Sequence, residues 1–336
     1  MPQRRPTLDE VAARAGVGRG TVSRAINGSP QVSGRARQAV LDAIDELGYV
    51  PNRAARSLVT RQTDTVALVV SESEERFFGE PFFAGVVRGV SAALAGSTRQ
   101  LVLAMAQSHE ERERLEHYLT GQHVDGVLLL SLHGDDALPE RLAAKGMPVV
   151  LGGRPFSVEA VSWVDVDNVG GGALATEHLL ARGRKRIGTI TGPIDMTAGA
   201  ARLRGYRQAL ADADVAADEK LIATGDFSEH SGYEAMGVLL ERAPGLDAVF
   251  AASDLMASGA LRRLREAARD VPADVAVVGF DDSSISRHTT PLLTTVHQPV
   301  EDMGRAMAEL LVARIDGRDV DLHVTLDTHL VVRDSS

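Results

Sequence analysis

The sequence predicts a small all-α head followed by a larger α/β region of two lobes with parallel sheets. Residues 7–48 contain three short helical segments separated by glycine-containing turns. From Thr63 onward, apolar runs alternate with amphipathic segments, which is the pattern of parallel sheets covered by helices on both faces. The charge changes at the same boundary. Residues 1–62 hold ten Arg and five acidic residues, a net +5, so the total of −10 leaves −15 on the remainder.

This charge asymmetry favours a polyanion as the partner of the head, while the acidic body repels it. On charge alone, a solvated basic arm remains the alternative. The chain of 336 residues is 44% hydrophobic and 24% charged, which is ordinary for a globular protein of two or three domains. The absence of cysteine excludes disulfide frameworks, zinc fingers, iron–sulfur clusters and thiol nucleophiles.

Membrane and export signals are also missing from the sequence. The longest apolar runs fall far short of the roughly 20 residues of a membrane helix. The first residues lack the apolar segment of a secretory signal. We therefore expect a cytoplasmic protein that makes no membrane contact.

The first two helices of the head have clear boundary signals. Thr7 and Glu10 have the spacing of a capping box, and Gly16 ends the first helix after about two turns. The second helix is predicted over residues 19–27, directly after the turn at 16–18. It places Val22 and Ile26 inward and turns four residues outward, namely Arg19, Gly20, Ser23 and Arg24.

The third helix completes the core of the head. Ser33 is its predicted N-cap and Gly48 its C′ residue. Its apolar face consists of Ala36, Val40, Ile44 and Leu47. Two helices joined by a tight glycine turn, with a third packed against them, form a helix-turn-helix arrangement.

The body is predicted to contain two series of four strands. The predicted strands are 65–70, 100–104, 126–130, 149–151, 187–190, 221–224, 248–251 and 275–278. The predicted helices are 83–95, 111–119, 173–181, 203–210, 233–240, 257–267 and 303–315. The final stretch, 323–332, is expected to cap or cross between the lobes.

The run from Thr7 to Gly28, with its continuation from Leu47 to Leu58, resembles the head of the LacI/GalR family of bacterial transcription regulators. The resemblance implies a helix-turn-helix DNA-binding domain at 1–50, a hinge helix at 51–62, and an effector-binding and dimerisation domain at 63–336. The last is expected to have the two-lobed periplasmic-binding-protein-like fold. Its N-lobe would comprise about 63–164 and 300–325, and its C-lobe about 165–298 and 326–336.

Carried over to this sequence, the family's base-reading positions are Arg19, Gly20 and Arg24, while Thr21 and Ser23 match positions near phosphates. Arginine that donates two hydrogen bonds to guanine is the commonest specific contact in the major groove. We therefore expect G·C pairs in each half-site of an inverted-repeat operator. Contact with phosphates alone is the alternative for both arginines.

Residues 52–59 match the family's hinge helix. A helix of eight residues is too short to be stable alone, so it needs a partner. The resemblance places Ala55 and Leu58 in the minor groove, where an apolar wedge unstacks bases and bends the duplex. The residues expected at the DNA backbone are Asn52, Arg53 and Arg56. For Leu58, the alternative is an ordinary linker residue packed on the body.

In the body, the resemblance makes Arg202 the effector-binding arginine, Asp281 the carboxylate that accepts hydroxyl hydrogens, and Phe227 the aromatic platform. A donor fork, an acceptor and an aromatic face suit a polyhydroxylated ring. Loops at the carboxyl ends of strands should bring four more positions to the same cleft or its walls. Three of them, Ser253, Asp254 and Gln298, are expected to bind the effector, and the fourth is the adjacent Asp282. No third ligand accompanies Asp281 and Asp282, so we expect no metal, and no cofactor is indicated.

The stretch 71–83 follows the first strand and contains four phenylalanines in a chain with 4% aromatic residues. We expect Phe77, Glu80 and Phe82 to face the effector, while other aromatic residues anchor the next helix. Together with the 18–20 and 252–256 segments, this stretch is similar to actinobacterial regulators that respond to cellobiose and related plant-wall oligosaccharides.

These features predict a homodimeric transcriptional repressor, not an enzyme, that a small sugar releases from double-stranded operator DNA. Three alternatives remain: a regulator of the same fold with a purine corepressor, a sugar-binding protein without a regulatory role, and a doubly wound enzyme. The sugar-binding alternative is disfavoured by the basic head, and the enzyme by the lack of a catalytic set or nucleotide loop. The operator sequence, target genes, sugar length, direction of the ligand effect and any oligomer beyond a dimer are left open.

Overall fold

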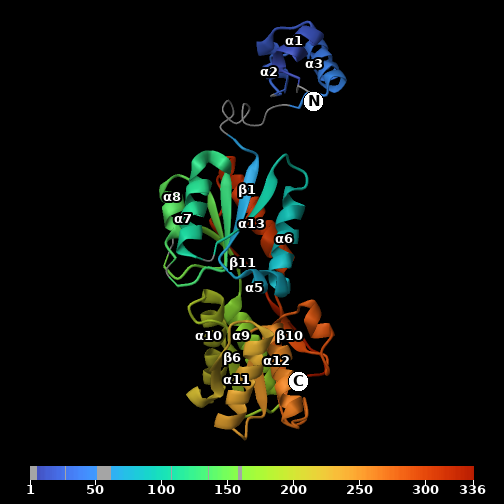
Figure 1. Cartoon of the computed structure of the whole chain (residues 1–336). Helices are drawn as coiled ribbons and strands as arrows, with labels where there is room; N and C mark the ends of the chain where they lie inside the picture. The colour runs from blue at the N-terminus through green and yellow to red at the C-terminus, as the bar shows by residue number, and fades with distance from the viewer. Residues whose placement is uncertain (1–5, 27, 51–61, 107, 135, 158–160) are drawn as a thin grey trace. The chain divides into compact units, whose positions relative to one another are not determined.

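The computed structural model describes residues 6–26, 28–50, 62–106, 108–134, 136–157 and 161–336. The chain divides into two compact units, residues 1–63 and 64–336, and each is described by itself. The described residues of the first unit form three helices, and the second unit consists of two α/β lobes (Figure 1).

The head consists of α1 (Leu8–Ala15), α2 (Arg19–Ile26) and α3 (Gly34–Leu47). The predicted capping box at Thr7 and the predicted N-cap of α3 are both present, and Gly16 and Gly48 end their helices with positive φ. The core includes Val11, Val22 and Val40, all fully buried. In α2 the second buried residue is Ala25, while the predicted Ile26 is only partly buried, because α2 ends there and its last turn is open on one side.

The N-lobe contains a six-stranded sheet in which every neighbouring pair is parallel. Its order is β11-β5-β4-β3-β1-β2. The strands are β1 (Thr65–Val70), β2 (Gln100–Met105), β3 (Gly126–Leu130), β4 (Val149–Gly152), β5 (Ser162–Val166) and β11 (His323–Leu326).

The C-lobe repeats this architecture with the order β12-β10-β9-β8-β6-β7. Its strands are β6 (Ile187–Thr191), β7 (Ile222–Thr224), β8 (Ala248–Ala251), β9 (Ala276–Asp281), β10 (Thr294–His297) and β12 (His329–Val331). All neighbours are parallel except β12, which runs antiparallel to β10. The two parallel sheets confirm the predicted fold class.

Helices cover both faces of each sheet, so each sheet has two apolar layers. The N-lobe helices are α5 (Glu74–Gly79), α6 (Pro81–Leu94), α7 (His109–Tyr118), α8 (Leu138–Ala144) and α13 (Val300–Ile315). Those of the C-lobe are α9 (Asn168–Ala181), α10 (Thr197–Asp212), α11 (Glu229–Arg242) and α12 (Asp254–Glu266). None of the helices in the described part of the chain has both the length and the apolar character that a membrane crossing requires.

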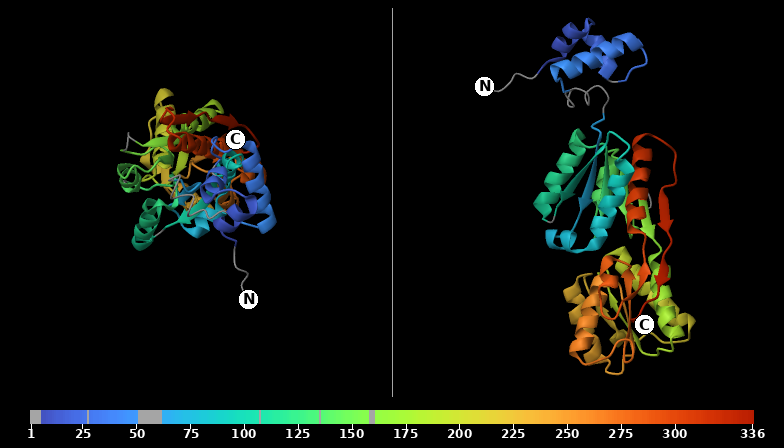
Figure 2. Two further views of the ribbon diagram at one scale, coloured as in Figure 1. Left: turned by 90° about the horizontal axis from the view of Figure 1, so that it is seen from above. Right: turned by 90° about the vertical axis from the view of Figure 1, so that its right-hand side faces the viewer.

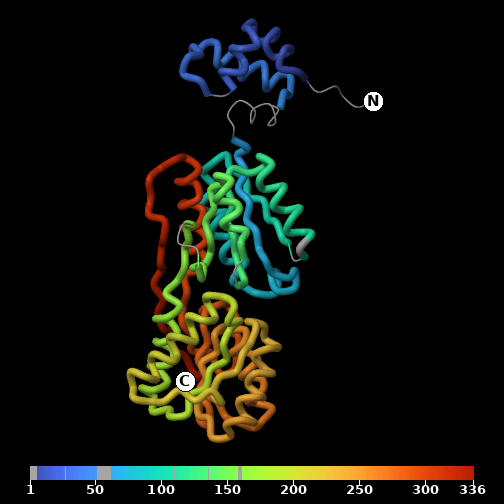
Figure 3. The backbone as a smooth tube through the Cα atoms, turned by 90° about the vertical axis from the view of Figure 1, so that its left-hand side faces the viewer, coloured from blue at the N-terminus to red at the C-terminus, as the bar shows by residue number. Residues whose placement is uncertain are grey.

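The chain passes between the lobes three times: from β5 to α9, from β10 to α13, and from β11 to β12. Figures 2 and 3 show that these connections run along one side of the lobes. Four of the twelve strands are not among the eight predicted: β5, β10, β11 and β12. They are short and carry polar residues such as Asp165 and Thr294, which hides the apolar signal of a strand.

Candidate functional site

A cavity of about 1110 Å³, partly open to solvent, lies between the two lobes. Its walls are formed mainly by loops at the carboxyl ends of the strands, which is where ligands bind in open α/β sheets. Seven of the nine predicted effector residues line it: Glu80, Phe82, Arg202, Phe227, Ser253, Asp281 and Gln298.

Arg202, on α10, is the central cation of the cavity and is only 5% exposed. Its Nε donates to Oδ1 of Asn168 over 2.9 Å, and its Nη1 donates to the carbonyl oxygen of Ala252 over 2.6 Å. Its guanidinium carbon lies 3.6 Å from the ring centre of Phe280. These contacts orient the guanidinium plane, and burial lowers the pKa of Arg202.

Two glycines allow α9 and α10 to pack closely enough for this arrangement. A Cβ on Gly172 would collide with the backbone of Arg202, and a Cβ on Gly205 would collide with the carbonyl oxygen of Val169. The glycine-rich start of α9 is therefore a helix-packing feature. It brings Asn168, the first residue of α9, next to the arginine.

Asp281 lies opposite this arginine at the end of β9, with a φ of 118°. Its Oδ1 accepts a hydrogen bond of 2.6 Å from Nε2 of Gln298 and lies 3.8 Å from Nη1 of Arg202, too far for a direct hydrogen bond. Burial raises the pKa of Asp281 well above its ordinary value, although the nearby guanidinium opposes the shift. Burial likewise raises the pKa of Glu80 and of Asp165.

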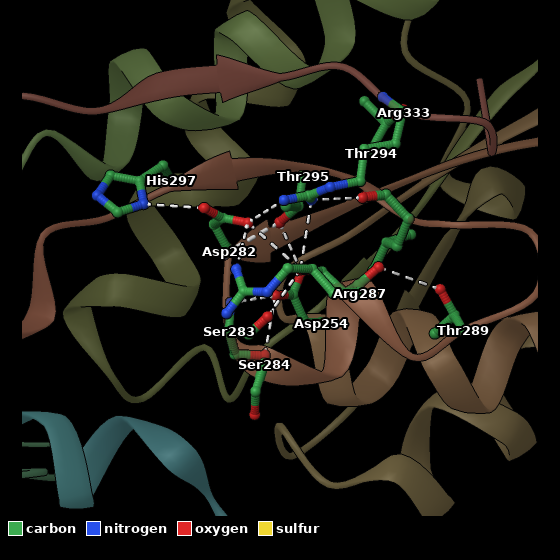
Figure 4. Close-up of polar contacts among 12 residues, drawn as sticks. Asp254, Asp282, Ser283, Ser284, Arg287, Thr289, Thr294, Thr295, His297 and Arg333 are labelled. Atoms are coloured by element: carbon green, nitrogen blue, oxygen red, sulfur yellow. Dashed lines mark hydrogen bonds and ion pairs between the residues drawn. The ribbon is translucent and has the colours of Figure 1, made fainter.

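Asp254, which was predicted to contact the effector, lies behind the cavity wall. It is fully buried at the start of α12 and does not line the cavity. One carboxylate oxygen accepts from the backbone N–H of Ser283 over 2.7 Å, and the other accepts from the hydroxyl of Thr295 over 2.5 Å. Figure 4 shows these contacts beside the ion pair of Asp282 with Arg333. The cluster braces the loop that presents Asp281.

The aromatic residues divide between ligand wall and core. Phe227 lines the cavity with a φ of 73°, and its ring lies against Gly192, where a Cβ would collide with it. Phe82 also lines the cavity. Phe77, which was predicted to face the effector, does not line the cavity: it is 8% exposed and packs at 5.3 Å from the ring of Phe83. The short helix α5 turns Phe77 into the N-lobe core.

Sequence reasoning missed several residues of the cavity wall, among them Ser131, Arg154, Phe156, Asp165 and Asn168. Asp165 accepts from Nδ2 of Asn168 over 2.9 Å, so it supports the partner of the central arginine. The signal for this pair was present in the Asp-Val-Asp-Asn run of residues 165–168. Because β5 was not among the predicted strands, this run was not expected to lie at the cleft.

The cavity thus offers one fixed guanidinium, several buried carboxyl groups and an aromatic face. Hydroxyl groups can accept from the guanidinium and donate to the carboxylates, and a sugar ring can stack on the aromatic face. This combination suits a polyhydroxylated, uncharged ligand. In the described residues, no cluster of three or more His, Asp and Glu side chains could hold a metal ion.

A second candidate surface lies on α2 of the head. Arg19, Gly20 and Arg24 are exposed, and Thr21 and Ser23 are partly buried. Arg24 donates from Nε to the carbonyl oxygen of Gly20 over 3.1 Å, so its guanidinium lies along its own helix. The five predicted hinge residues, Asn52, Arg53, Ala55, Arg56 and Leu58, lie outside the described residues.

Comparison with known families gives two matches. Residues 7–52 match the family described as bacterial regulatory proteins, lacI family. Residues 176–336 match the periplasmic binding protein-like domain.

The chain is 60% identical over 336 residues to the HTH-type transcriptional regulator CelR of Thermobifida fusca, covering 99% of both chains. It is 36% identical over 330 residues to the HTH-type transcriptional repressor PurR of Edwardsiella ictaluri, covering 96% of this chain and 94% of the other. Among solved structures, it is similar to a transcriptional regulator CelR-cellobiose complex, with 58% identity, 99% and 100% coverage and a TM-score of 0.80. It is also similar to the lac repressor dimer bound to operator and the anti-inducer ONPF, with 27% identity, 99% coverage of both chains and a TM-score of 0.87.

Proposed function

Because the chain belongs to the LacI family of bacterial regulatory proteins, we propose that it is a repressor that cellobiose or a related plant-wall oligosaccharide releases from its operator. Such a protein binds operator DNA through its head and a sugar effector through its body. We infer that it acts in the cytoplasm, on the chromosome, and that its cleft binds the effector without chemical conversion.

The observation that carries the sugar proposal is the pair formed by Arg202 and Asp281 across the cavity. The two groups lie 3.8 Å apart without a direct hydrogen bond to each other, with Arg202 buried and the side chain of Asp281 only 14% exposed. Burying such groups without their full set of hydrogen bonds costs free energy, and ligand hydroxyls placed between and around them would supply the missing hydrogen bonds. The similarity to a CelR structure with cellobiose supports this assignment.

On the DNA side, we assign base reading to Arg19 and Arg24. Gly20 would allow the helix to approach the DNA closely, and Thr21 and Ser23 would lie near phosphates. The exposure of the first three supports this, since a recognition helix must present free side chains to the groove. The hinge residues keep the roles given by the resemblance. Two copies of the chain would then hold the two halves of an inverted repeat.

The proposed mechanism is a shift between two states of the dimer. Effector and operator stabilise different arrangements of the lobes, so each lowers the affinity for the other by the same factor. The hinge helices that the resemblance implies are too short to be stable unless they pair, so a modest change in their spacing would remove much of the affinity.

The test is fluorescence anisotropy of a labelled duplex from upstream of the protein's own gene, at fixed salt, with and without sugar. Cellobiose and xylobiose are compared with hypoxanthine. Release of the duplex by cellobiose is the expected result. A protein–DNA complex that neither cellobiose nor xylobiose releases would overturn the effector assignment.

The same experiment distinguishes a purine corepressor, which the similarity to PurR makes the main alternative. A corepressor tightens the complex instead of releasing it. Tighter binding with hypoxanthine would leave the role of the head standing and overturn the sugar interpretation of the cleft.

A further inference from the structure

The two lobes touch each other directly at His133, next to the cavity. This residue follows β3 of the N-lobe, and its Nδ1 lies 2.9 Å from Oδ2 of Asp195, which follows β6 of the C-lobe. Its Nε2 lies 3.1 Å from Oε1 of Glu72, which follows β1. The backbone adds another link, since the N–H of Gly134 donates to the carbonyl oxygen of Asp195 over 2.8 Å.

The number of protons on the ring decides whether both side-chain contacts can form. An ionised carboxylate only accepts hydrogen bonds, so each contact requires an N–H from the imidazole. A neutral imidazole has one N–H, whereas the imidazolium has two. The hydrogen bond to Glu72 is the largest cause of a raised pKa at His133, burial opposes it, and Asp195 acts in the same direction as Glu72.

The charged groups around the ring come from the loop after β1, from α5 and from the loop after β6. Glu72 is 8% exposed and is held by Nη1 of Arg76 at 2.6 Å, so it cannot easily turn away. Arg76 also contacts Glu80 through Nε at 3.1 Å. Arg76 is linked to the ring of His133 through Glu72. Asp195, on the C-lobe side, is 57% exposed. The buried N-lobe carboxylate is therefore fixed, while the C-lobe carboxylate is free to leave when the lobes separate.

We propose that His133 is a positioning residue for effector binding: its imidazolium ties the lobes together over the cleft, and loss of a proton releases one of the two ties. This inference rests on the proposed function, because it takes the occupant of the cleft to be the effector. The neighbours on both sides, Leu132 and Gly134, line the cavity. Movement at this point therefore changes the cavity wall itself.

The expected pH dependence has a definite sign. Separation of the lobes takes Asp195 away from the ring but leaves Glu72, which lies on the same lobe as His133, so the pKa of His133 is higher with the lobes closed than with them apart. The contribution of His133 to closure is therefore complete below the open-state value and is lost as the pH rises through the higher, closed-state value. Effector affinity should fall over the same interval.

The test is isothermal titration of the full-length protein with cellobiose between pH 6 and pH 8.5. The wild type should lose affinity over this range, by up to about tenfold for each pKa unit that separates the two states. His133→Gln and Asp195→Asn should bind more weakly at pH 6 and respond much less to pH. His230→Gln, at an exposed position on α11, is the matched control and should follow the wild type. A wild-type slope that His133→Gln retains would overturn the proposal.

Melting temperatures without sugar separate this inference from the sugar assignment. The difference between wild type and Asp195→Asn, the variant that removes only the contact between the lobes, should shrink as the pH rises from 6 to 8.5, whatever the ligand is. If the difference shrinks but no cellobiose binds at any pH, the sugar assignment fails and the tie between the lobes stands. If cellobiose binds and the difference stays constant, the proposal for His133 is overturned.

Discussion

Asn168 and Arg202 meet across two helices, with Nε of the arginine donating to Oδ1 of the asparagine over 2.9 Å. The asparagine is held in turn by Asp165, and the arginine by the carbonyl oxygen of Ala252. The guanidinium is thus oriented before any ligand arrives. A preoriented donor loses less conformational freedom on binding, which favours affinity and selects ligands of matching shape.

Gly205→Ala should destabilise the C-lobe and weaken effector binding together. The added Cβ would collide with the backbone of α9, and overpacking of this kind costs about 1 to 3 kcal/mol. The measurement is the midpoint of thermal unfolding combined with cellobiose titration. Gly96→Ala is the control, since a Cβ there meets no atom within 4 Å. Equal stability of the two variants would contradict the packing argument.

Asp281→Asn should reduce sugar affinity about 10- to 100-fold, the effect of losing about 1.5 to 3 kcal/mol of charge-assisted hydrogen bonding. The amide still fills the same volume and can face Gln298, so the fold should be retained. Operator binding without sugar should stay close to wild type, and the release of the duplex should need correspondingly more sugar. Unchanged sugar affinity in a folded variant would remove this residue from the effector site.

Arg24→Ala should weaken operator binding by about 1 to 3 kcal/mol and relax the preference at one base pair of each half-site. The reason is that an exposed arginine on the recognition helix can donate two hydrogen bonds to guanine. Competition binding with single-base operator variants measures both effects. Arg242→Ala, on an exposed position of the C-lobe, should leave them unchanged. A uniform loss across all sequences would indicate a phosphate contact instead.

Acidification from pH 8 to about pH 5.5 should stabilise the C-lobe through Asp254. Burial raises the pKa of Asp254 to about 7, whereas an unfolded aspartate titrates near 3.9. The stabilisation is therefore complete below about pH 4 and is lost as the pH rises through 7, with a slope of up to about 1.4 kcal/mol per pH unit.

Urea unfolding followed by circular dichroism at several pH values tests this expectation. Asp254→Asn should remove this part of the slope while lowering stability overall, because the amide cannot accept from both Ser283 and Thr295. Asp212→Asn, at an exposed position of α10, is the control. The same slope in Asp254→Asn as in wild type would show that another group titrates.

Much of the architecture could be predicted because its signals are local. The capping pair of Thr7 and Glu10 and the terminal Gly16 and Gly48 act within one helical turn of the residues they govern. Long apolar strands such as β1 and β3 identify themselves by composition, since both of their faces are buried. The strands that escaped prediction are short and partly polar, so neighbouring strands rather than their own residues define them.

The residues of the site were likewise predicted only in part. The motifs of the sequence identified Arg202, Asp281 and Gln298, which do line the cavity, but they also suggested Phe77 and Asp254, which pack behind it. No local pattern distinguishes a side chain that faces a cleft from one that supports its wall, because the packing of the surrounding elements sets the direction of each side chain.

The amino-acid sequence by itself determined the helices of the head, the longer strands and helices of the body, and the kinds of residue that the cleft contains. The tertiary structure alone decided which of them meet. Asn168 and Arg202 are 34 residues apart, and His133 and Asp195 are 62 apart on different lobes. Contacts between such distant positions depend on how sheets and helices pack, and on the lobes coming together, so they leave no trace in the spacing of the residues.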